Sequence, residues 1–379
     1  MPVKTKPPVA GKLSWPQVHA FRMARHHLTK RAPKEDLARV VGDIGGVQAQ
    51  VMSAAELQAA VRVECSVEDV RAALWNDKKL VKTWLMRGTL HLLPADDLPL
   101  FTAAMRTHWI RTRNAWLEYV QMNESEFTEL IDAIGQALDG QALTRDELMA
   151  RVGKGRSERV QAVLKSGWGG ILKPVARSGL LCFGPSRGQS VTFVQPRQWL
   201  GTWRDVDPDA ALTEVARRYM RAYGPATKND FTRWFGTWTG IGGAAWAGLA
   251  EECVPVSIEG QRADLLAADL DRMSGDTPEP AVRLLPNFDP YLMGYANRDH
   301  LFSSEHRSRV SRTAGWISAV VLVDGRVVAT WTHAVAKRAL TVTVDPFRKL
   351  SPSTLKGVRT SADSLAVALG LGEAAVRVA

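Results

Sequence analysis

Cysteine is scarce in this sequence, and long apolar runs are missing. The 379 residues include three cysteines, Cys65, Cys182 and Cys253, which lie far apart and form no CxxC pair. Such spacing argues against a disulfide framework and against a zinc site. No segment approaches the roughly 20 consecutive apolar residues of a membrane span, and the N-terminal segment lacks the apolar centre of a signal peptide. We therefore expect a cytoplasmic protein with no membrane partner.

Metal-ligand spacings are missing as well. His26 and His27 are adjacent, but the eight histidines include no HxxxH or HExxH pattern, and the acidic residues form no recognisable cluster. A histidine metal site would have to be assembled from distant segments, and a magnesium site would need grouped carboxylates. We expect neither a metal ion nor another cofactor.

Basic residues, by contrast, are in excess. Lys and Arg number 49 against 39 Asp and Glu, which gives a formal net charge of +10 at pH 7. This excess favours a polyanionic partner, either a nucleic acid or an anionic membrane surface. Hydrophobic residues make up 45% of the chain, which is ordinary for a folded protein, and the length implies two to four domains.

One order of elements recurs along the chain. After Thr144 come a helical segment, a second periodic stretch at 157–175, and the runs LLCFG and SVTFV, which predict a hairpin around 185–188. Helix, helix and hairpin in this order are typical of a winged helix. Similar series occupy 37–93 and 209–267. Four sequences match or approach the capping box that begins a helix: Ser53 with Glu56, Ser66 with Asp69, Thr144 with Glu147, and Thr227 with Asp230.

The last hundred residues have a different character. Asp324-Gly325 lies between β-branched runs, which is a strong hairpin signal, and an amphipathic helix is predicted near 351–369. We therefore expect an α+β chain with three tandem winged-helix domains at 14–122, 123–204 and 205–280. A C-terminal β-rich region with a terminal helix follows at 281–379.

Three ordered motifs resemble one known family. TWLMRGTLHLLPADDL (83–98), LLPNFDPYLMGY (284–295) and VLVDGRVVATW (321–331) are similar to the winged-helix family that contains the AlkZ-type and YcaQ-type DNA glycosylases. The resemblance runs from about residue 17 to the C-terminus. It implies three winged-helix domains in a C-shaped arrangement around duplex DNA, with a C-terminal β-rich part.

A short motif resembles one branch of that family. AlkZ-like members carry Gln-x-Gln, which Gln48 and Gln50 match, whereas YcaQ-like members have a carboxylate in the second position. The resemblance implies a monomeric, monofunctional DNA glycosylase that hydrolyses the N-glycosidic bond of bulky N7-alkylpurines in duplex DNA. It further implies self-resistance by unhooking adducts or interstrand crosslinks of a DNA-alkylating antibiotic, with Gln48 and Gln50 catalytic.

The chemistry of such a substrate is compatible with two amides. An N7-alkylguanine already carries positive charge, so its glycosidic bond breaks without a strong acid, and amide oxygens can position a water and face the cationic sugar. Residues i and i+2 share one side only of an extended segment, and Gly45-Gly46 permits such an entry. Spacing alone favours a simpler interpretation, in which both glutamines cap neighbouring helices or hydrogen-bond a tight connection; the resemblance reverses that preference.

Other residues are candidates for DNA contact. Arg187 lies at the predicted hairpin tip, and Lys154 and Arg156 flank a predicted helix start, where they could contact phosphates or form an ordinary solvated surface. His91 could approach DNA or satisfy a buried partner. Asp289 precedes a proline, so it serves either the active cleft or a turn.

Two other functions fit parts of the sequence. A non-enzymatic winged-helix regulator would need the same basic surface, and the glutamine pair would then be incidental. A metal-dependent nuclease would need a carboxylate cluster, which the sequence does not display.

Overall fold

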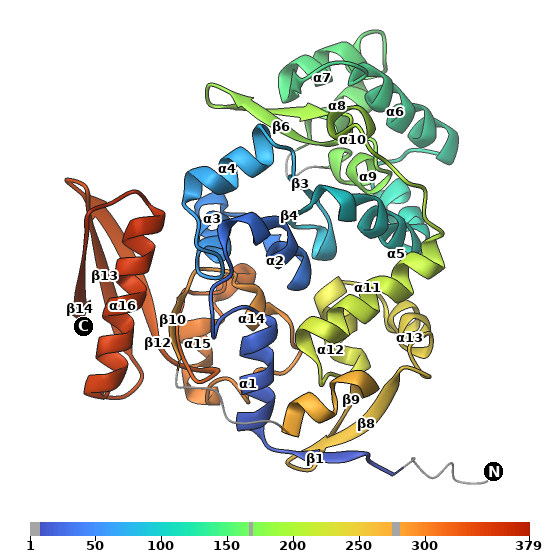
Figure 1. The fold of residues 1–379 in the computed structure, drawn as a ribbon. Helices are drawn as coiled ribbons and strands as arrows, with labels where there is room; N and C mark the ends of the chain where they lie inside the picture. The colour runs from blue at the N-terminus through green and yellow to red at the C-terminus, as the bar shows by residue number, and fades with distance from the viewer. Residues whose placement is uncertain (1–7, 167–169, 275–280) are drawn as a thin grey trace.

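The computed structural model describes residues 8–166, 170–274 and 281–379, in which helices and four antiparallel or mixed β-sheets alternate (Figure 1). This is the α+β fold that the sequence predicts. Among the described residues, no helix has a stretch long and apolar enough to cross a bilayer.

The first sheet carries Gln48, and Gln50 follows its edge strand. Its strands are ordered β2 (Val47–Gln48), β4 (Leu90–Pro94), β3 (Leu80–Trp84), and all pairs are antiparallel. A single turn of 3-10 helix, η2 (Met86–Gly88), joins β3 to β4 where the sequence predicts a turn near Arg87-Gly88. The helices of this unit are α2 (Leu37–Asp43), α3 (Met52–Ala60) and α4 (Val67–Trp75).

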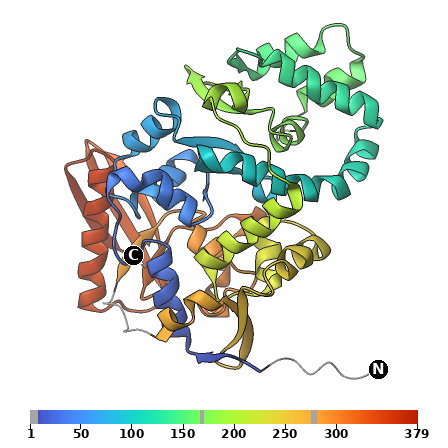
Figure 2. The same ribbon diagram turned by 45° about the vertical axis from the view of Figure 1, so that its right-hand side comes forward.

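The second unit is a lobe that stands above the rest of the molecule (Figure 2). Its sheet is ordered β5 (Leu143–Thr144), β7 (Ser190–Val194), β6 (Cys182–Arg187), so the predicted hairpin is confirmed. Ring contacts between Trp84 of β3 and Phe183 of β6, with centroids 4.8 Å apart, join the lobe to the first sheet. Its helices are α6 (Glu124–Ala137), α7 (Arg145–Gly153), α8 (Glu158–Lys165), α9 (Leu172–Arg177) and α10 (Pro196–Leu200).

One predicted helical stretch in this lobe is divided. The pattern at 157–175 becomes two helices, α8 and α9, and Gly170, a poor helix former, lies between them; residues 167–169 lie outside the described part of the chain. The apolar residues that suggested one face, Val160, Val163, Leu164 and Ile171, are all buried together.

The third unit takes a strand from the start of the chain. β1 (Gly11–Leu13) pairs in parallel with β8 (Cys253–Ile258), which pairs with β9 (Gln261–Leu266). Helix α1 (Trp15–Arg25) packs on α11 (Pro208–Tyr223) of the same unit. There, buried Arg22 donates to the Tyr223 carbonyl at 3.1 Å. Residues 11–25 therefore lie against the third unit, although the first predicted domain, 14–122, begins within this segment. The helices are α11 (Pro208–Tyr223), α12 (Lys228–Phe235) and α13 (Thr239–Ala247).

The C-terminal region is the β-rich element that the sequence predicts. Five strands follow one another across its sheet, and the Asp324-Gly325 hairpin lies between the second and third. The terminal helix α16 (Pro352–Ala368) buries Val358 and Leu365 against the core. The strands are β10 (Val282–Leu285), β11 (Val320–Val323), β12 (Arg326–Ala336), β13 (Ala339–Pro346) and β14 (Glu373–Val378), with α14 (Pro290–Met293) and α15 (Arg307–Val310) between the first two.

Helix starts agree with the capping boxes at three of four places. Ser66, Thr144 and Thr227 each accept a hydrogen bond from the third helical residue of α4, α7 and α12. Ser53 is not a cap, because α3 begins one residue earlier at Met52, and Glu56 instead forms an ion pair with Arg71.

A continuous core connects the first unit to the third and to the C-terminal sheet. The long helix α5 (Leu98–Tyr119) packs along α11, and buried side chains of α3, α5, α11, α12 and β11 belong to one cluster. The loop that carries the glutamine pair is thus fixed by several units at once.

Candidate active site

Gln48 lies on β2, separated from Gly45-Gly46 by Val47, and Gln50 lies at a bend two residues further along the chain. Gln48 pairs with His91 across β2 and β4, and the Ala49 amide donates to the Leu90 carbonyl at 2.7 Å. Ala49 is fully buried between the two glutamines, whereas Gln50 is exposed and Gln48 retains 6% exposure. The non-helical backbone expected from the spacing is confirmed.

Both glycines are required by their surroundings. Gly45 has φ +72° and Gly46 has φ +89°, values that side chains other than hydrogen rarely tolerate. A Cβ on Gly45 would come within 2.8 Å of the Trp234 ring, and one on Gly46 within 2.6 Å of Leu93. The chain therefore turns into β2 where α12 and β4 leave no room for a side chain.

Arg87 is the side chain that fixes the Gln48 amide. Its Nη2 donates to Gln48 Oε1 at 3.2 Å and lies 3.2 Å from His91 Nε2. A guanidinium can only donate, so the amide oxygen of Gln48 faces Arg87 and its NH₂ group is directed elsewhere. The amide of Gln50 is held less closely, since its Oε1 accepts from the Leu90 amide at 3.4 Å.

Arg87 is itself held by the end of α12. Its Nη1 donates to the Trp234 carbonyl, and its backbone adopts φ +56° beside Gly236. A Cβ on Gly236 would lie 2.7 Å from the Arg87 backbone. Burial lowers the pKa of Arg87 to about 10, so the guanidinium stays charged at neutral pH.

His91 is a neutral partner of Arg87. Its Nδ1 lies 3.0 Å from the Thr89 carbonyl, which can only accept, so Nδ1 carries the hydrogen and Nε2 accepts from Arg87. Burial, reinforced by Arg87, lowers the pKa of His91 to about 3. The ring is 2% exposed. Of the two roles weighed from the sequence, contact with DNA and satisfaction of a buried partner, the structure supports the second.

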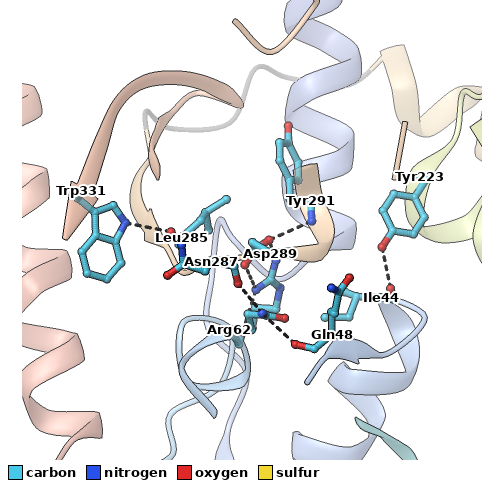
Figure 3. Close-up of polar contacts among 10 residues, drawn as sticks. Ile44, Gln48, Arg62, Tyr223, Leu285, Asn287, Asp289, Tyr291 and Trp331 are labelled. Carbon is cyan, nitrogen blue, oxygen red and sulfur yellow. Dashed lines mark hydrogen bonds and ion pairs between the residues drawn. The ribbon is translucent and has the colours of Figure 1, made fainter. Parts of the chain in front are cut away.

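A buried network supports the glutamine strand from behind (Figure 3). Gln58 donates through Nε2 to the Gln48 carbonyl at 3.4 Å and to the Asn287 carbonyl at 2.8 Å. Arg62 forms a two-pronged ion pair with Asp289, at 2.8 and 2.6 Å, and its Nη1 also donates to the Gln58 carbonyl at 2.9 Å. The C-terminal region is thereby tied to the glutamine strand.

Asp289 belongs to this support. Both its side chain and that of Arg62 are 0% exposed, and one carboxylate oxygen also accepts from the Tyr291 amide at 2.9 Å as the cap of α14. The turn role weighed for this residue is therefore the observed one. With its oxygens engaged and no exposure, the carboxylate does not face solvent.

The third unit closes the other side of the glutamine loop. Tyr223 of α11 donates its hydroxyl hydrogen to the Ile44 carbonyl at 3.0 Å, and Trp234 of α12 fills the space beside Gly45. The glutamine strand is thus bounded by α11 and α12 on one side and by residues 287–289 on the other.

The other predicted DNA contacts belong to the second unit. Lys154 is exposed at the end of α7, and Arg156 is half-buried with its Nε donating to the Val152 carbonyl at 2.9 Å. Arg187 ends β6 next to the hairpin turn, where it forms an ion pair with Glu147, and its side chain is 53% exposed. The structure does not bring these three residues into the hydrogen-bond network of Gln48.

Three residues of the network escaped prediction from the sequence: Arg87, Gln58 and Arg62. Arg87 lies within one of the family-like motifs, and its position in a predicted turn between two strands was a usable signal. Gln58 and Arg62 share one face of a helical turn at spacing i, i+4, but their partners Asn287 and Asp289 are more than 220 residues away.

Comparison with known proteins identifies the family. The family model described as DNA glycosylase AlkZ-like matches residues 41–368. The chain belongs to the AlkZ-like DNA glycosylase family. It is 38% identical over 376 residues to an interstrand DNA cross-link repair glycosylase of Streptomyces sahachiroi, covering 97% of this chain and 100% of that protein.

A solved structure supports the same assignment. The DNA glycosylase AlkZ of Streptomyces sahachiroi matches with a TM-score of 0.87 and 37% identity over 97% of this chain and 100% of that chain. The family resemblance inferred from the three motifs is therefore confirmed, and this chain is a DNA glycosylase.

Proposed function

We propose that this chain hydrolyses the N-glycosidic bond of bulky N7-alkylpurines in duplex DNA and unhooks interstrand crosslinks of a DNA-alkylating antibiotic. It would act as a cytoplasmic monomer, give its host self-resistance, and begin base excision repair. Three winged-helix domains in a C-shaped arrangement would hold the duplex. The crosslink part of this proposal rests on the similarity to the 38% identical cross-link repair glycosylase of Streptomyces sahachiroi.

The single observation that supports this mechanism is the pair of amides at β2, of which Arg87 fixes the first. Gln48 and Gln50 flank a buried alanine on non-helical backbone, and the guanidinium of Arg87 holds the first amide in one orientation. Positioned dipoles of this kind stabilise a transition state because they need no reorganisation as charge develops.

We infer different roles for the two amides. Arg87 occupies one lone pair of Gln48 Oε1, and the second lone pair of this oxygen accepts a hydrogen bond from the attacking water and orients it. Gln50 is exposed and its Oε1 has only a 3.4 Å contact, so this oxygen faces the positive charge that grows on the sugar. Neither amide takes up a proton at neutral pH, so water is positioned and polarised rather than deprotonated in full.

The remaining DNA contacts are proposed by charge and position. Arg187, Lys154 and Arg156 would contact phosphates from the second unit. Arg187 would have to exchange its ion pair with Glu147 for a phosphate. His91, being buried, would act on DNA only through Arg87.

Release of a free base tests the proposal. With a duplex that carries one N7-methylguanine, Gln48→Ala and Gln50→Ala should each lower the single-turnover excision rate on the order of 10²-fold, since each removes one positioned group. Gln136→Ala, on the exposed face of α6, is the matched control and should excise like the parent protein.

Two outcomes would contradict the proposal. Parent-like excision by both glutamine variants would remove the catalytic assignment, and strand breaks without free base that disappear with EDTA would indicate a nuclease. Comparing an N7-methylguanine monoadduct with a duplex crosslinked through two N7 positions then measures whether unhooking is part of the activity.

A further inference from the structure

A pocket of about 640 Å³ begins at Arg87, the residue that holds Gln48. Its walls come from the end of η2, from α12, and from the segment between α14 and α15. We call it the arginine pocket. The charged residues of its lining are Arg87, Arg233, Arg298, Arg307 and Asp299.

The charges of the arginine pocket do not balance. Asp299 is the one acidic residue in its lining, and it is engaged by Arg307 at 2.7 Å. Arg87 donates to an amide oxygen, an imidazole nitrogen and a carbonyl, all of which are neutral. Three guanidinium groups therefore remain without a carboxylate among the described lining residues.

Arg298 has unused hydrogen-bonding capacity in this place. Its Nη1 donates to Ser311 Oγ at 3.0 Å, and its Nε is buried without a hydrogen-bond partner in the described structure. Arg233 projects from the exposed face of α12, one residue before Trp234, whose carbonyl holds Arg87.

Neighbouring cations of the pocket lower the pKa values of Arg298 and Arg87. Burial lowers the pKa of Arg298, and the charge of Arg233 lowers it further. Burial lowers the pKa of Arg87, to which Arg298 also contributes. Like charges that line one pocket raise its free energy, and an anion between them would lower it.

We propose that the arginine pocket binds a backbone phosphate of the lesion-carrying strand, adjacent to the alkylated nucleotide. This inference rests on the proposed function, because it takes DNA with a lesion at Gln48 as the ligand. Guanidinium groups match phosphate oxygens in planar, paired hydrogen bonds. Arg87 contacts both the pocket and Gln48, so a bound phosphate fixes the sugar it belongs to relative to the catalytic amide.

Neutral linkages in the DNA locate the phosphate. A duplex with a tetrahydrofuran abasic analogue cannot be hydrolysed and permits equilibrium binding, and a methylphosphonate at one linkage removes one charge. For the parent protein, neutralising one linkage beside the abasic analogue should weaken binding about tenfold to a hundredfold, the effect of losing a hydrogen bond to a charged group.

Protein variants assign that linkage to the pocket. Arg233→Gln and Arg298→Gln should weaken binding to the unmodified duplex and show little additional weakening with the same methylphosphonate. Their log K against log salt slopes should be smaller by about 0.9 for each phosphate that the variant no longer binds. Arg359→Gln, exposed on α16, is the matched control and should keep the slope and the methylphosphonate effect of the parent protein.

The proposal is overturned if neutralising that linkage weakens binding by Arg233→Gln as much as binding by the parent protein, or if no linkage beside the abasic analogue affects binding by the parent protein. Arg233 is exposed, so Arg233→Gln should melt like the parent protein and keeps the test valid if Arg298→Gln does not fold. Base release from N7-methylguanine is measured separately. If base is released but the pocket variants keep the full methylphosphonate effect, the phosphate site alone is refuted. If the pocket variants reduce the methylphosphonate effect but no base is released, the glycosylase mechanism alone is refuted.

Discussion

The ion pair beneath the glutamine strand allows a quantitative test. Arg62 and Asp289 are both 0% exposed and share two hydrogen bonds, at 2.8 and 2.6 Å. Removing one partner leaves the other charge buried without compensation, which typically costs about 3–5 kcal/mol. Asp289→Asn and Arg62→Met should therefore each lower the free energy of unfolding by about that amount.

The double variant separates charge from packing. Arg62→Met combined with Asp289→Asn leaves no buried charge, and the asparagine oxygen can still accept from the Tyr291 amide as Asp289 does at 2.9 Å. Buried ion pairs are often replaceable by neutral groups at little cost. The double variant should thus be more stable than either single variant, with a coupling free energy of at least about 2 kcal/mol.

Urea denaturation followed by tryptophan fluorescence measures these differences, with the slope m checked for each variant. A matched control is the exposed pair Arg39 and Asp36, with side chains 53% and 35% exposed; Arg39→Met with Asp36→Asn should leave the midpoint nearly unchanged. Additive losses of stability in the buried double variant, twice those of the single variants, would refute the charge argument.

Two further predictions concern the glutamine loop and pH. Gly46→Ala places a methyl group 2.6 Å from Leu93 at φ +89°, so it should destabilise the fold by about 1–3 kcal/mol and reduce excision. The control Gly188→Ala, at φ +60° with nothing within 4 Å, should cost about 1 kcal/mol and leave excision intact. Equal effects of the two variants in melting and base-release assays would contradict this prediction. Burial lowers the pKa of His91 from 6.5 to about 3, so the unfolded chain binds a proton that the folded state does not. The stabilisation from neutral His91 is complete above pH 6.5 and falls by up to about 1.4 kcal/mol per pH unit towards pH 3; urea midpoints at pH 7.5 and 5 check this, and His91→Gln should show a smaller decrease.

Local sequence patterns predicted the helices and hairpins better than the long-range contacts of their side chains. The hairpin at Asp324-Gly325 and the capping boxes at Thr144 and Thr227 are determined by neighbouring residues, and the structure confirms them. Ser53 matches the same capping pattern but lies inside α3, and Glu56 forms an ion pair with Arg71. The capping pattern alone therefore did not locate the start of this helix.

In the candidate site, too, the local backbone could be predicted and the contacts between distant residues could not. The spacing of the two glutamines, supported by Gly45-Gly46, predicted non-helical backbone at Gln48, and both glycines adopt positive φ. The contact from Arg87 spans 39 residues, and the contact from Gln58 to Asn287 spans 229. Such pairs depend on how units pack, which periodicity and spacing do not encode.

The charge beside Gln48 is the feature that most constrains the chemistry. A guanidinium next to a sugar that becomes cationic would oppose bond cleavage if it stood alone, because the two charges repel. In an N7-alkylpurine, however, the positive charge is already present on the base and moves to the sugar as the base departs neutral. The total charge near Arg87 is therefore the same before and after the bond breaks. A phosphate in the arginine pocket would neutralise Arg87 on its far side and leave its hydrogen bond to Gln48 in place, so the amide would be fixed without adding net positive charge to the transition state.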